Sequence, residues 1–112
     1  MATRYWVGGS GNWSDATNHW AATSNGAPAV GNLPTSADDV VFDQNSNTGT
    51  GAFTVTVDAA SVANCLSFST SALDGVMTLA GTAALNVYGS FTLPATNFTF
   101  SYSYNISLIL KL

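Results

Sequence analysis

The last two thirds of the chain contain a series of short apolar runs: VVF at residues 40–42, FTVTV at 53–57, LSF at 66–68, VMTL at 76–79, LNV at 85–87, FTL at 91–93, FTF at 98–100 and ISL at 106–108. Most of these runs alternate an apolar residue with Thr, Ser or Asn, which is the period of a half-buried β-strand. Residues typical of turns separate the runs. The pattern predicts an all-β fold.

The runs also recur at a longer interval. Two series of apolar residues are spaced by about 20 to 22 residues: Val55, Met77 and Phe98 form one, and Leu66, Leu85 and Ile106 form the other. Two interleaved series with a shared interval are typical of a β-solenoid, in which each coil contributes more than one strand. We therefore predict a short β-solenoid, similar to a parallel β-helix. A β-sandwich or jelly roll, which also has many short strands and turns, is the alternative.

Residues 1–37 differ in composition from the rest. They hold all three tryptophans, the only histidine and the turn-forming sequence GGSG at residues 8–11. We expect a loop-rich N-terminal cap at residues 1–37 and a body of stacked strands at residues 38–112. Together they form one domain, because 112 residues suit a single core. Within the cap we predict a short strand at residues 5–7 and a helical turn with Ser14 as its N-cap.

The charge content is low and acidic. Charged residues make up 7% of the chain, against about a quarter of an average soluble domain. Six Asp residues outnumber the two cations, Arg4 and Lys111, and give a net charge of −4. Two isolated cations cannot neutralise a run of phosphates, so we expect no nucleic-acid partner and no anionic membrane partner. No run approaches the roughly 20 apolar residues of a membrane span, and the N-terminus lacks the apolar core of a signal peptide.

Three motifs connect the cap to the body: WVGGSGNW at residues 6–13, NHW at 18–20 and PTSADDVVF at 34–42. They resemble the N-terminal part of β-helical phage virion proteins and autotransporter-like adhesins, in which W-x-G-G-x-G-x-W, N-x-W and P-x-x-x-D-D-V-x-F precede stacked strands. The resemblance covers residues 5–43 and extends to the later strands only through their pattern. It implies a β-helical architecture and a structural or adhesive role on a virion or a bacterial surface.

The tryptophans have two interpretations. The first coil of a solenoid leaves an apolar end with unpaired backbone groups, which large aromatic side chains can close. We predict that Trp6, Trp13 and Trp20 form such a structural cap. The alternative is a glycan-stacking platform, as in carbohydrate-binding modules.

The only acidic cluster is formed by Asp38, Asp39 and Asp43, which with Asn45 offer hard oxygen ligands of the kind that Ca²⁺ prefers. The sequence has neither an EF-hand loop nor a calcium-binding nonapeptide repeat. Turn formation and protection of a strand edge explain the cluster better. We predict no metal site and no cofactor.

Residues that could carry catalysis are isolated in the sequence. His19 has no nucleophile or orienting acid at a recognisable spacing. Asp58 and Asp74 follow strands at turns, where Asp is favoured for local reasons, and they do not form the carboxylate pair of a glycosidase. Cys65, the only cysteine, lies in an apolar run as a small buried hydrophobe does. We predict no catalytic residues and no enzyme activity.

Together these features predict a non-enzymatic structural protein of a phage virion, which decorates the capsid or forms part of a head or tail fibre. The lack of an export signal fits this location, because virion proteins accumulate in the host cytoplasm and leave by lysis. Its partners would be other virion proteins, such as capsid or tail proteins. The alternative is a bacterial surface adhesin or carbohydrate-binding β-helix domain, located at the cell surface or outside it, with a host glycan as partner.

The sequence YNISLILKL at residues 104–112 has high β-propensity, one charge, no proline and no glycine. A last strand of this kind exposes an edge and an apolar face, which a partner subunit would cover. Closed symmetry would stop the contact from growing into fibres. We predict a homo-oligomer with Ile106, Leu108 and Leu110 at or near the interface, and the resemblance to phage β-helical proteins implies a trimer.

Overall fold

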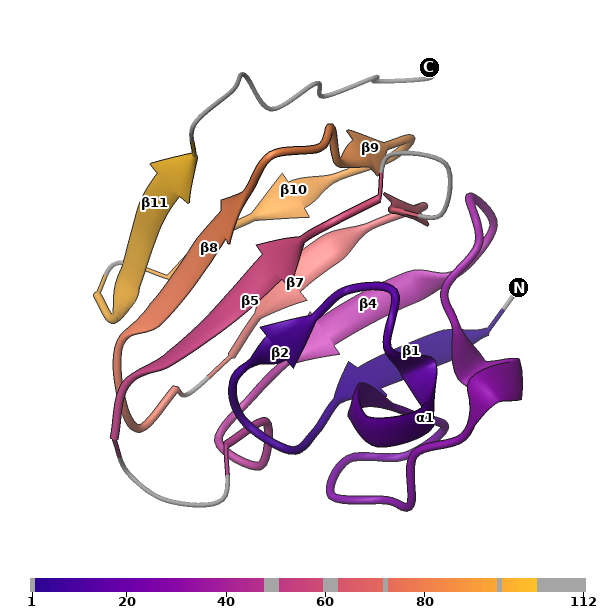
Figure 1. The fold of residues 1–112 in the computed structure, drawn as a ribbon, viewed down its shortest axis with the longest axis horizontal. Coiled ribbons are helices and arrows are strands. Elements are labelled where there is room, and N and C mark those ends of the chain that lie inside the picture. The colour runs from indigo at the N-terminus through magenta and orange to yellow at the C-terminus, as the bar shows by residue number, and fades with distance from the viewer. Residues whose placement is uncertain (1, 48–50, 60–62, 72, 95, 103–112) are drawn as a thin grey trace.

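The structure is a computed structural model and describes residues 2–47, 51–59, 63–71, 73–94 and 96–102. Its strands are β1 (Thr3–Trp6), β2 (Gly11–Asn12), β3 (Trp20–Ala21), β4 (Asp39–Phe42), β5 (Phe53–Val57), β6 (Asn64–Cys65), β7 (Phe68–Thr70), β8 (Met77–Gly81), β9 (Asn86–Val87), β10 (Phe91–Thr92) and β11 (Phe98–Tyr102). Helical structure within the described residues is limited to α1 (Ala16–His19) and the 3₁₀ turn η1 (Val30–Asn32). The prediction of an all-β fold is confirmed (Figure 1).

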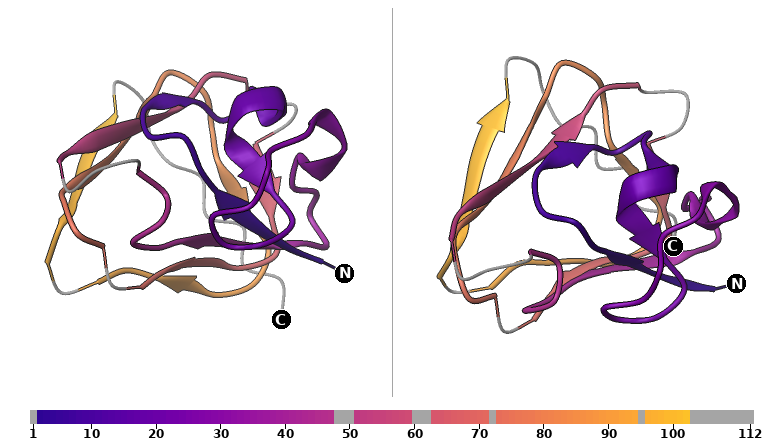
Figure 2. Two further views of the ribbon diagram at one scale, coloured as in Figure 1. Left: turned by 90° about the horizontal axis from the view of Figure 1, so that it is seen from below. Right: turned by 60° about the horizontal axis from the view of Figure 1, so that its bottom comes forward.

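The strands form three sheets. Sheet A has the order β10-β7-β4-β1-β3, sheet B the order β11-β8-β5-β2, and sheet C contains β6 and β9. The chain visits the sheets in turn, since β4, β5 and β6 are followed by β7, β8 and β9, in sheets A, B and C respectively. Neighbouring strands are parallel except for β1 and β3. In Figure 2 the sheets lie along the sides of a roughly triangular outline.

The register shows which residues stack on one another. Phe53 pairs with Met77, which pairs with Phe98; Val40 pairs with Phe68, which pairs with Phe91; and Cys65 pairs with Val87. The predicted series was therefore displaced, because Val55 pairs with Leu79 rather than with Met77. The interval between partners is 24 residues from Phe53 to Met77 but 21 from Met77 to Phe98. Connections of unequal length thus make the spacing along the chain an inexact guide to stacking.

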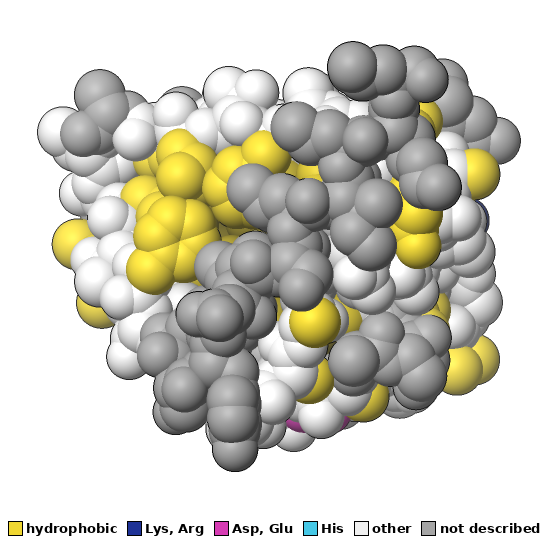
Figure 3. Space-filling model, turned by 90° about the horizontal axis from the view of Figure 1, so that it is seen from above, with side chains coloured by type: hydrophobic (Ala, Val, Ile, Leu, Met, Phe, Trp, Pro, Cys, Tyr) yellow, Lys and Arg dark blue, Asp and Glu magenta, His cyan; other side chains and the backbone are white. Residues whose placement is uncertain are grey.

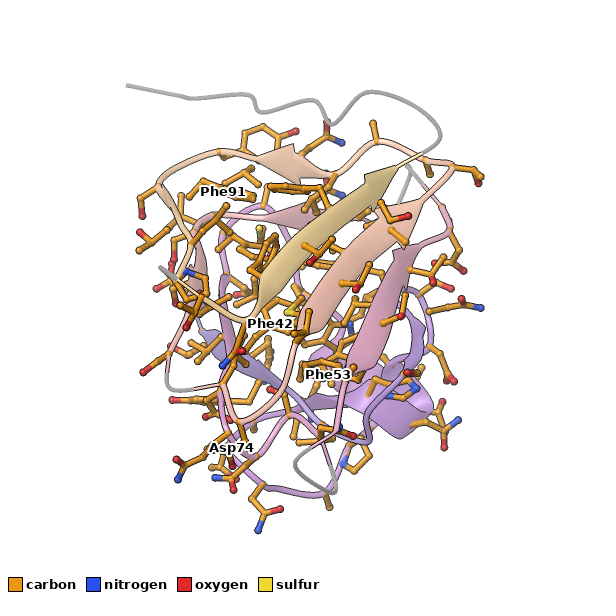
Figure 4. All side chains as sticks on the ribbon, turned by 90° about the vertical axis from the view of Figure 1, so that its left-hand side faces the viewer. Phe42, Phe53, Asp74 and Phe91 are labelled. Carbon is orange, nitrogen blue, oxygen red and sulfur yellow. The ribbon has the colours of Figure 1, made fainter. Side chains whose placement is uncertain are left out.

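Side chains alternate between the interior and the surface. Buried and half-buried positions alternate along β5 and along β8. Val55 and Leu79 therefore face inward, whereas the Thr residues next to them in each strand face outward. This follows from the two-residue period of a strand. Full burial of an aliphatic side chain stabilises the fold by about 1.5–3 kcal/mol. Figure 4 shows Phe42 and Phe53 within the stack and Asp74 at a surface turn.

The N-terminal 37 residues contribute strands as well as loops. β1 pairs with β4, placing Arg4 opposite Val40, and β2 pairs with β5, placing Gly11 opposite Val55. The predicted strand at residues 5–7 appears as β1, shifted toward the N-terminus. β3 then runs antiparallel along β1 and closes this end of sheet A.

The prediction that Ser14 caps the helical turn is wrong. Asp15 occupies the N-cap position of α1 without a side-chain capping hydrogen bond. The Ser14 hydroxyl instead donates to a carboxylate oxygen of Asp58, and its backbone N–H donates to the other oxygen at 3.1 Å. Asp58 follows β5, so the pairing of β2 with β5 brings these two residues together.

Candidate functional site

Trp6, Trp13 and Trp20 meet at the N-terminal end of the stack, where each side chain is fully buried. Trp20 packs edge-on against the other two, with its ring centroid 5.1 Å from that of Trp6 and 4.9 Å from that of Trp13. Phe42 of β4 lies within 6.2 Å of all three rings. Trp13 also stacks on Phe68, at 6.4 Å between centroids. The cluster therefore joins the N-terminal segment to the core of the body.

Two of the indole groups also hold the loops in place. Trp6 Nε1 donates a hydrogen bond to the carbonyl oxygen of Gly9 at 2.7 Å, and Trp20 Nε1 donates to that of Trp13 at 2.8 Å. The buried Nε1 of Trp13 has no hydrogen-bond partner within the described part of the chain. The side chain of Trp13 therefore contributes through packing alone.

The packing of His19 and its neighbour Asn18 explains why glycines stand at residues 8 and 11, between the first two tryptophans. Its ring stacks on Trp6, with centroids 4.5 Å apart and planes 5° apart, and its Nδ1 donates to the carbonyl oxygen of Val7 at 2.7 Å. A Cβ at Gly11 would lie 2.0 Å from His19 Nε2. Gly8 has a φ of +83°, and a Cβ there would lie 2.8 Å from the backbone oxygen of Asn18. The motif W-x-G-G-x-G and the later histidine thus form one packed unit.

This geometry bears on the two interpretations of the tryptophans. A sugar stacks on the exposed face of an aromatic ring, and Trp6, Trp13 and Trp20 have no exposed surface. Their rings contact one another, His19 and phenylalanines of the body instead. We therefore set the glycan-stacking interpretation aside.

Asp38, Asp39 and Asp43 each bind a different part of the chain. Asp38 accepts hydrogen bonds from the backbone N–H of Ala2 and of Thr35 and from the Thr35 hydroxyl. Asp39 accepts one from the Ser67 hydroxyl at 2.6 Å. Asp43 accepts one from the Ser24 hydroxyl at 2.7 Å and one from the backbone N–H of Asn45 at 2.9 Å. These carboxylates hold turns and connections in place, and no group of three or more His, Cys, Asp or Glu residues suited to a metal is found in the described part of the chain.

We expect EDTA to leave the melting temperature of the protein unchanged. The three carboxylates accept hydrogen bonds from separate partners rather than facing a common point, and Ca²⁺ needs six to eight converging oxygens. Differential scanning fluorimetry with EDTA, and then with excess CaCl₂, measures this. A fall of several degrees in EDTA that calcium reverses would show that the cluster binds a metal.

The Asp38 carboxylate should make the fold sensitive to acid. Burial alone would raise its pKa, but the hydrogen bonds from Thr35 and Ala2 and the charge of Arg4 outweigh burial and lower the pKa below 3.8. A lowered pKa stabilises the fold above pH 3.8, and this stabilisation is lost as the pH falls through the pKa of the folded state. We expect Asp38→Asn to lower the free energy of unfolding at pH 7. The difference in this free energy between the variant and the wild type should shrink as the pH falls toward 3. Urea unfolding at both pH values tests this, and a difference that does not change with pH would contradict it.

Cys65 is a buried hydrophobe. Its side chain is fully buried in β6, and burial, together with the charge of Asp39, raises the pKa of the thiol to about 12. The thiol is therefore protonated at neutral pH and lacks the thiolate character of a reactive cysteine.

At the opposite end of the stack from the tryptophans, apolar side chains are partly exposed. Phe100 of β11 is 46% exposed and Leu93, which follows β10, is 37% exposed. The ring of Phe100 contacts those of Phe98 and Phe91, with centroids 5.0 and 6.3 Å away. Figure 3 looks onto this end and shows hydrophobic side chains gathered in one area.

Ile106, Leu108 and Leu110, which we predict at or near an interface between subunits, lie outside the described residues. Phe100 was not among the residues predicted for that interface. The signal for Phe100 was its inward position in the FTF run at the end of the strand series, where no further described strand covers it.

Comparison with protein-family models, with curated proteins and with solved structures returned no match. The resemblance of the N-terminal motifs to β-helical surface proteins therefore stays a prediction. Among the described residues, no helix is both long and apolar enough to cross a membrane. Strand order and side-chain packing define the chain as an all-β protein in which β3 covers the N-terminal edge of sheet A.

Proposed function

We propose that this chain is a short β-solenoid that serves as a non-enzymatic structural protein of a phage virion, as a capsid decoration or as a component of a head or tail fibre. The observation that carries the proposal is the strand order: successive strands visit sheets A, B and C, and each pairs in parallel with the strand one coil earlier. Sandwiches and jelly rolls are built from antiparallel strands. Between the named strands of the described region, antiparallel pairing is confined to β1 and β3.

The use of the polar and aromatic side chains supports a structural role. His19 supports Trp6, Asp58 anchors Ser14, and Asp38 ties the first residues of the chain to the body. His19 and Asp58 were weighed as catalytic candidates and Asp38 as a calcium ligand, and each makes a specific contact within the fold. The low charge agrees with a protein that works inside an assembly, as does the resemblance of the N-terminal motifs to phage β-helical proteins.

In this proposal the partners are capsid or tail proteins of the same virion and further copies of the chain. The resemblance implies a trimer, with Ile106, Leu108 and Leu110 at or near the contact between copies. A stacked-strand body suits assembly, because its ends offer strand edges to a partner.

Immunogold electron microscopy of particles purified from the native source tests the proposal. Antibodies against the protein should label particles at regular positions on the head or tail, and serum taken before immunisation should not. Unlabelled particles, with the protein recovered only in the soluble fraction, would contradict a virion role. Saturable binding to a glycan array would then favour the adhesin alternative.

A further inference from the structure

The two ends of the stack differ in how their strand edges are covered. At the N-terminal end, β3 pairs antiparallel with β1, and the isolated bridge between Ala21 and Pro28 continues this cover. The buried tryptophans fill the interior behind it. The other edge strands of sheets A and B have no described strand on their outer edges: β2 and β10 have two residues each, whereas β11, the last strand of sheet B, has five. An edge strand of this kind is a template for pairing with another chain.

The backbone of β11 presents hydrogen-bonding groups along this edge. The N–H of Met77 donates to the carbonyl oxygen of Asn97, so Asn97 faces β8. Neighbouring residues of a strand direct their backbone groups to opposite sides. The N–H and carbonyl groups of Phe98 and Phe100 therefore point away from β8, toward the free edge.

The strand β11 and the residues before it, back to Val76, carry no charge that would oppose pairing. From Val76 to Tyr102 the sequence has no Asp, Glu, Lys, Arg or His, and all six Asp residues lie at or before Asp74. Charged side chains are a common protection of edge strands, and this edge lacks them. Two copies, each with a net charge of −4, can therefore pair along β11 without placing charged side chains of this strand in contact.

We propose that two copies of the chain associate through this edge, with β11 of one copy antiparallel to β11 of the other about a two-fold axis at Phe100. The inference rests on the self-association in the proposed function, and it specifies the surface and the symmetry. A contact of this kind is isologous and closes after two copies, so it gives a dimer in place of the trimer that the resemblance implies.

The sequence of β11 is self-complementary in this arrangement. Phe100 lies opposite Phe100 of the second copy, and Thr99 lies opposite its Ser101. The apolar positions of both copies then share one face and the hydroxyl positions share the other. Aromatic pairs and Thr–Ser pairs directly opposite each other stabilise antiparallel strands. The pairing would also cover Phe100, which is 46% exposed in the single chain.

Sedimentation velocity of the full chain at tens of micromolar tests the contact. We expect a dimer for the wild type and a monomer for Phe100→Asp, which places two carboxylates on the two-fold axis. Val30→Asp is the matched control, because Val30 is 75% exposed and lies in η1, which is far from β11 in sequence and lies beside β3. It should remain dimeric.

A cysteine at position 100 gives a second test that tolerates partial loss of stability. Residues opposite each other in a hydrogen-bonded antiparallel pair have Cα atoms about 5.5 Å apart, within the range that a disulfide spans. Oxidised Phe100→Cys should migrate as a covalent dimer on a non-reducing gel, whereas Val30→Cys should not, and the buried Cys65 leaves the wild type monomeric on the gel.

The outcomes separate this inference from the proposed function. A trimeric wild type that Phe100→Asp leaves intact would overturn the contact at β11 but not the self-association of a virion protein. A monomeric wild type, together with a Phe100→Cys variant that forms no covalent dimer, would overturn the contact too. This result would indicate that another part of the chain covers the edge. Neither result depends on the labelling of particles.

Discussion

Trp13→Ala should destabilise the protein by about 3–5 kcal/mol, the range found for removing a buried large aromatic side chain. Trp13 is fully buried and contacts Trp20, Phe42 and Phe68, so its loss removes packing from both the N-terminal segment and the body. A loss of this size is a large fraction of the 5–15 kcal/mol that stabilises a typical domain. Urea unfolding followed by tryptophan fluorescence and circular dichroism measures it.

Trp13→Phe is the matched control. The indole N–H of Trp13 has no partner within the described residues, so phenylalanine removes no hydrogen bond and keeps an aromatic ring against Phe42 and Phe68. We expect a clearly smaller loss than for alanine. A Trp13→Ala variant with the wild-type free energy of unfolding would show that the ring does not hold the N-terminal segment to the body.

Gly81→Ala should destabilise the fold by about 3 kcal/mol, through backbone strain combined with overpacking. Gly81 ends β8 with a φ of +152°, a conformation that residues with a side chain rarely adopt. A Cβ there would lie 2.3 Å from the backbone oxygen of Val57 and 2.9 Å from its nitrogen. Val57 is the register partner of Gly81 in β5, so relief of the clash requires two paired strands to separate.

Gly31→Ala serves as the control for Gly81→Ala, because no atom beyond the adjoining chain lies within 4 Å of the Cβ position at Gly31. A surface change of this kind should alter the free energy of unfolding by less than about 0.5 kcal/mol. Equal denaturation midpoints for the two variants would mean that β8 moves away from β5 at little cost. That result would contradict the close strand contact at this position.

Several features of the protein could be read from the sequence because they depend on neighbouring residues. The alternation in FTVTV predicted β5 and its inward valines, since the two-residue period is a property of the extended backbone itself. The burial of Cys65 followed from its apolar run. The W-x-G-G-x-G motif indicated a tight turn between large aromatics, which the contacts of Gly8 and Gly11 with the segment around His19 explain.

Only the tertiary structure decided how these local elements meet. Val55 faces Leu79 rather than Met77 because connections of unequal length set the register, and packing in the interior selects it. Asp38, Asp39 and Asp43 are near in sequence but bind Thr35, Ser67 and Ser24, because a strand and its turns direct neighbouring side chains to different sides. The tryptophans are buried because they pack against one another and against Phe42, whereas Phe100 is partly exposed in β11, which no described strand follows. Sequence spacing measures distance along the chain, whereas the burial of a residue depends on which distant segments of the chain pack against that residue.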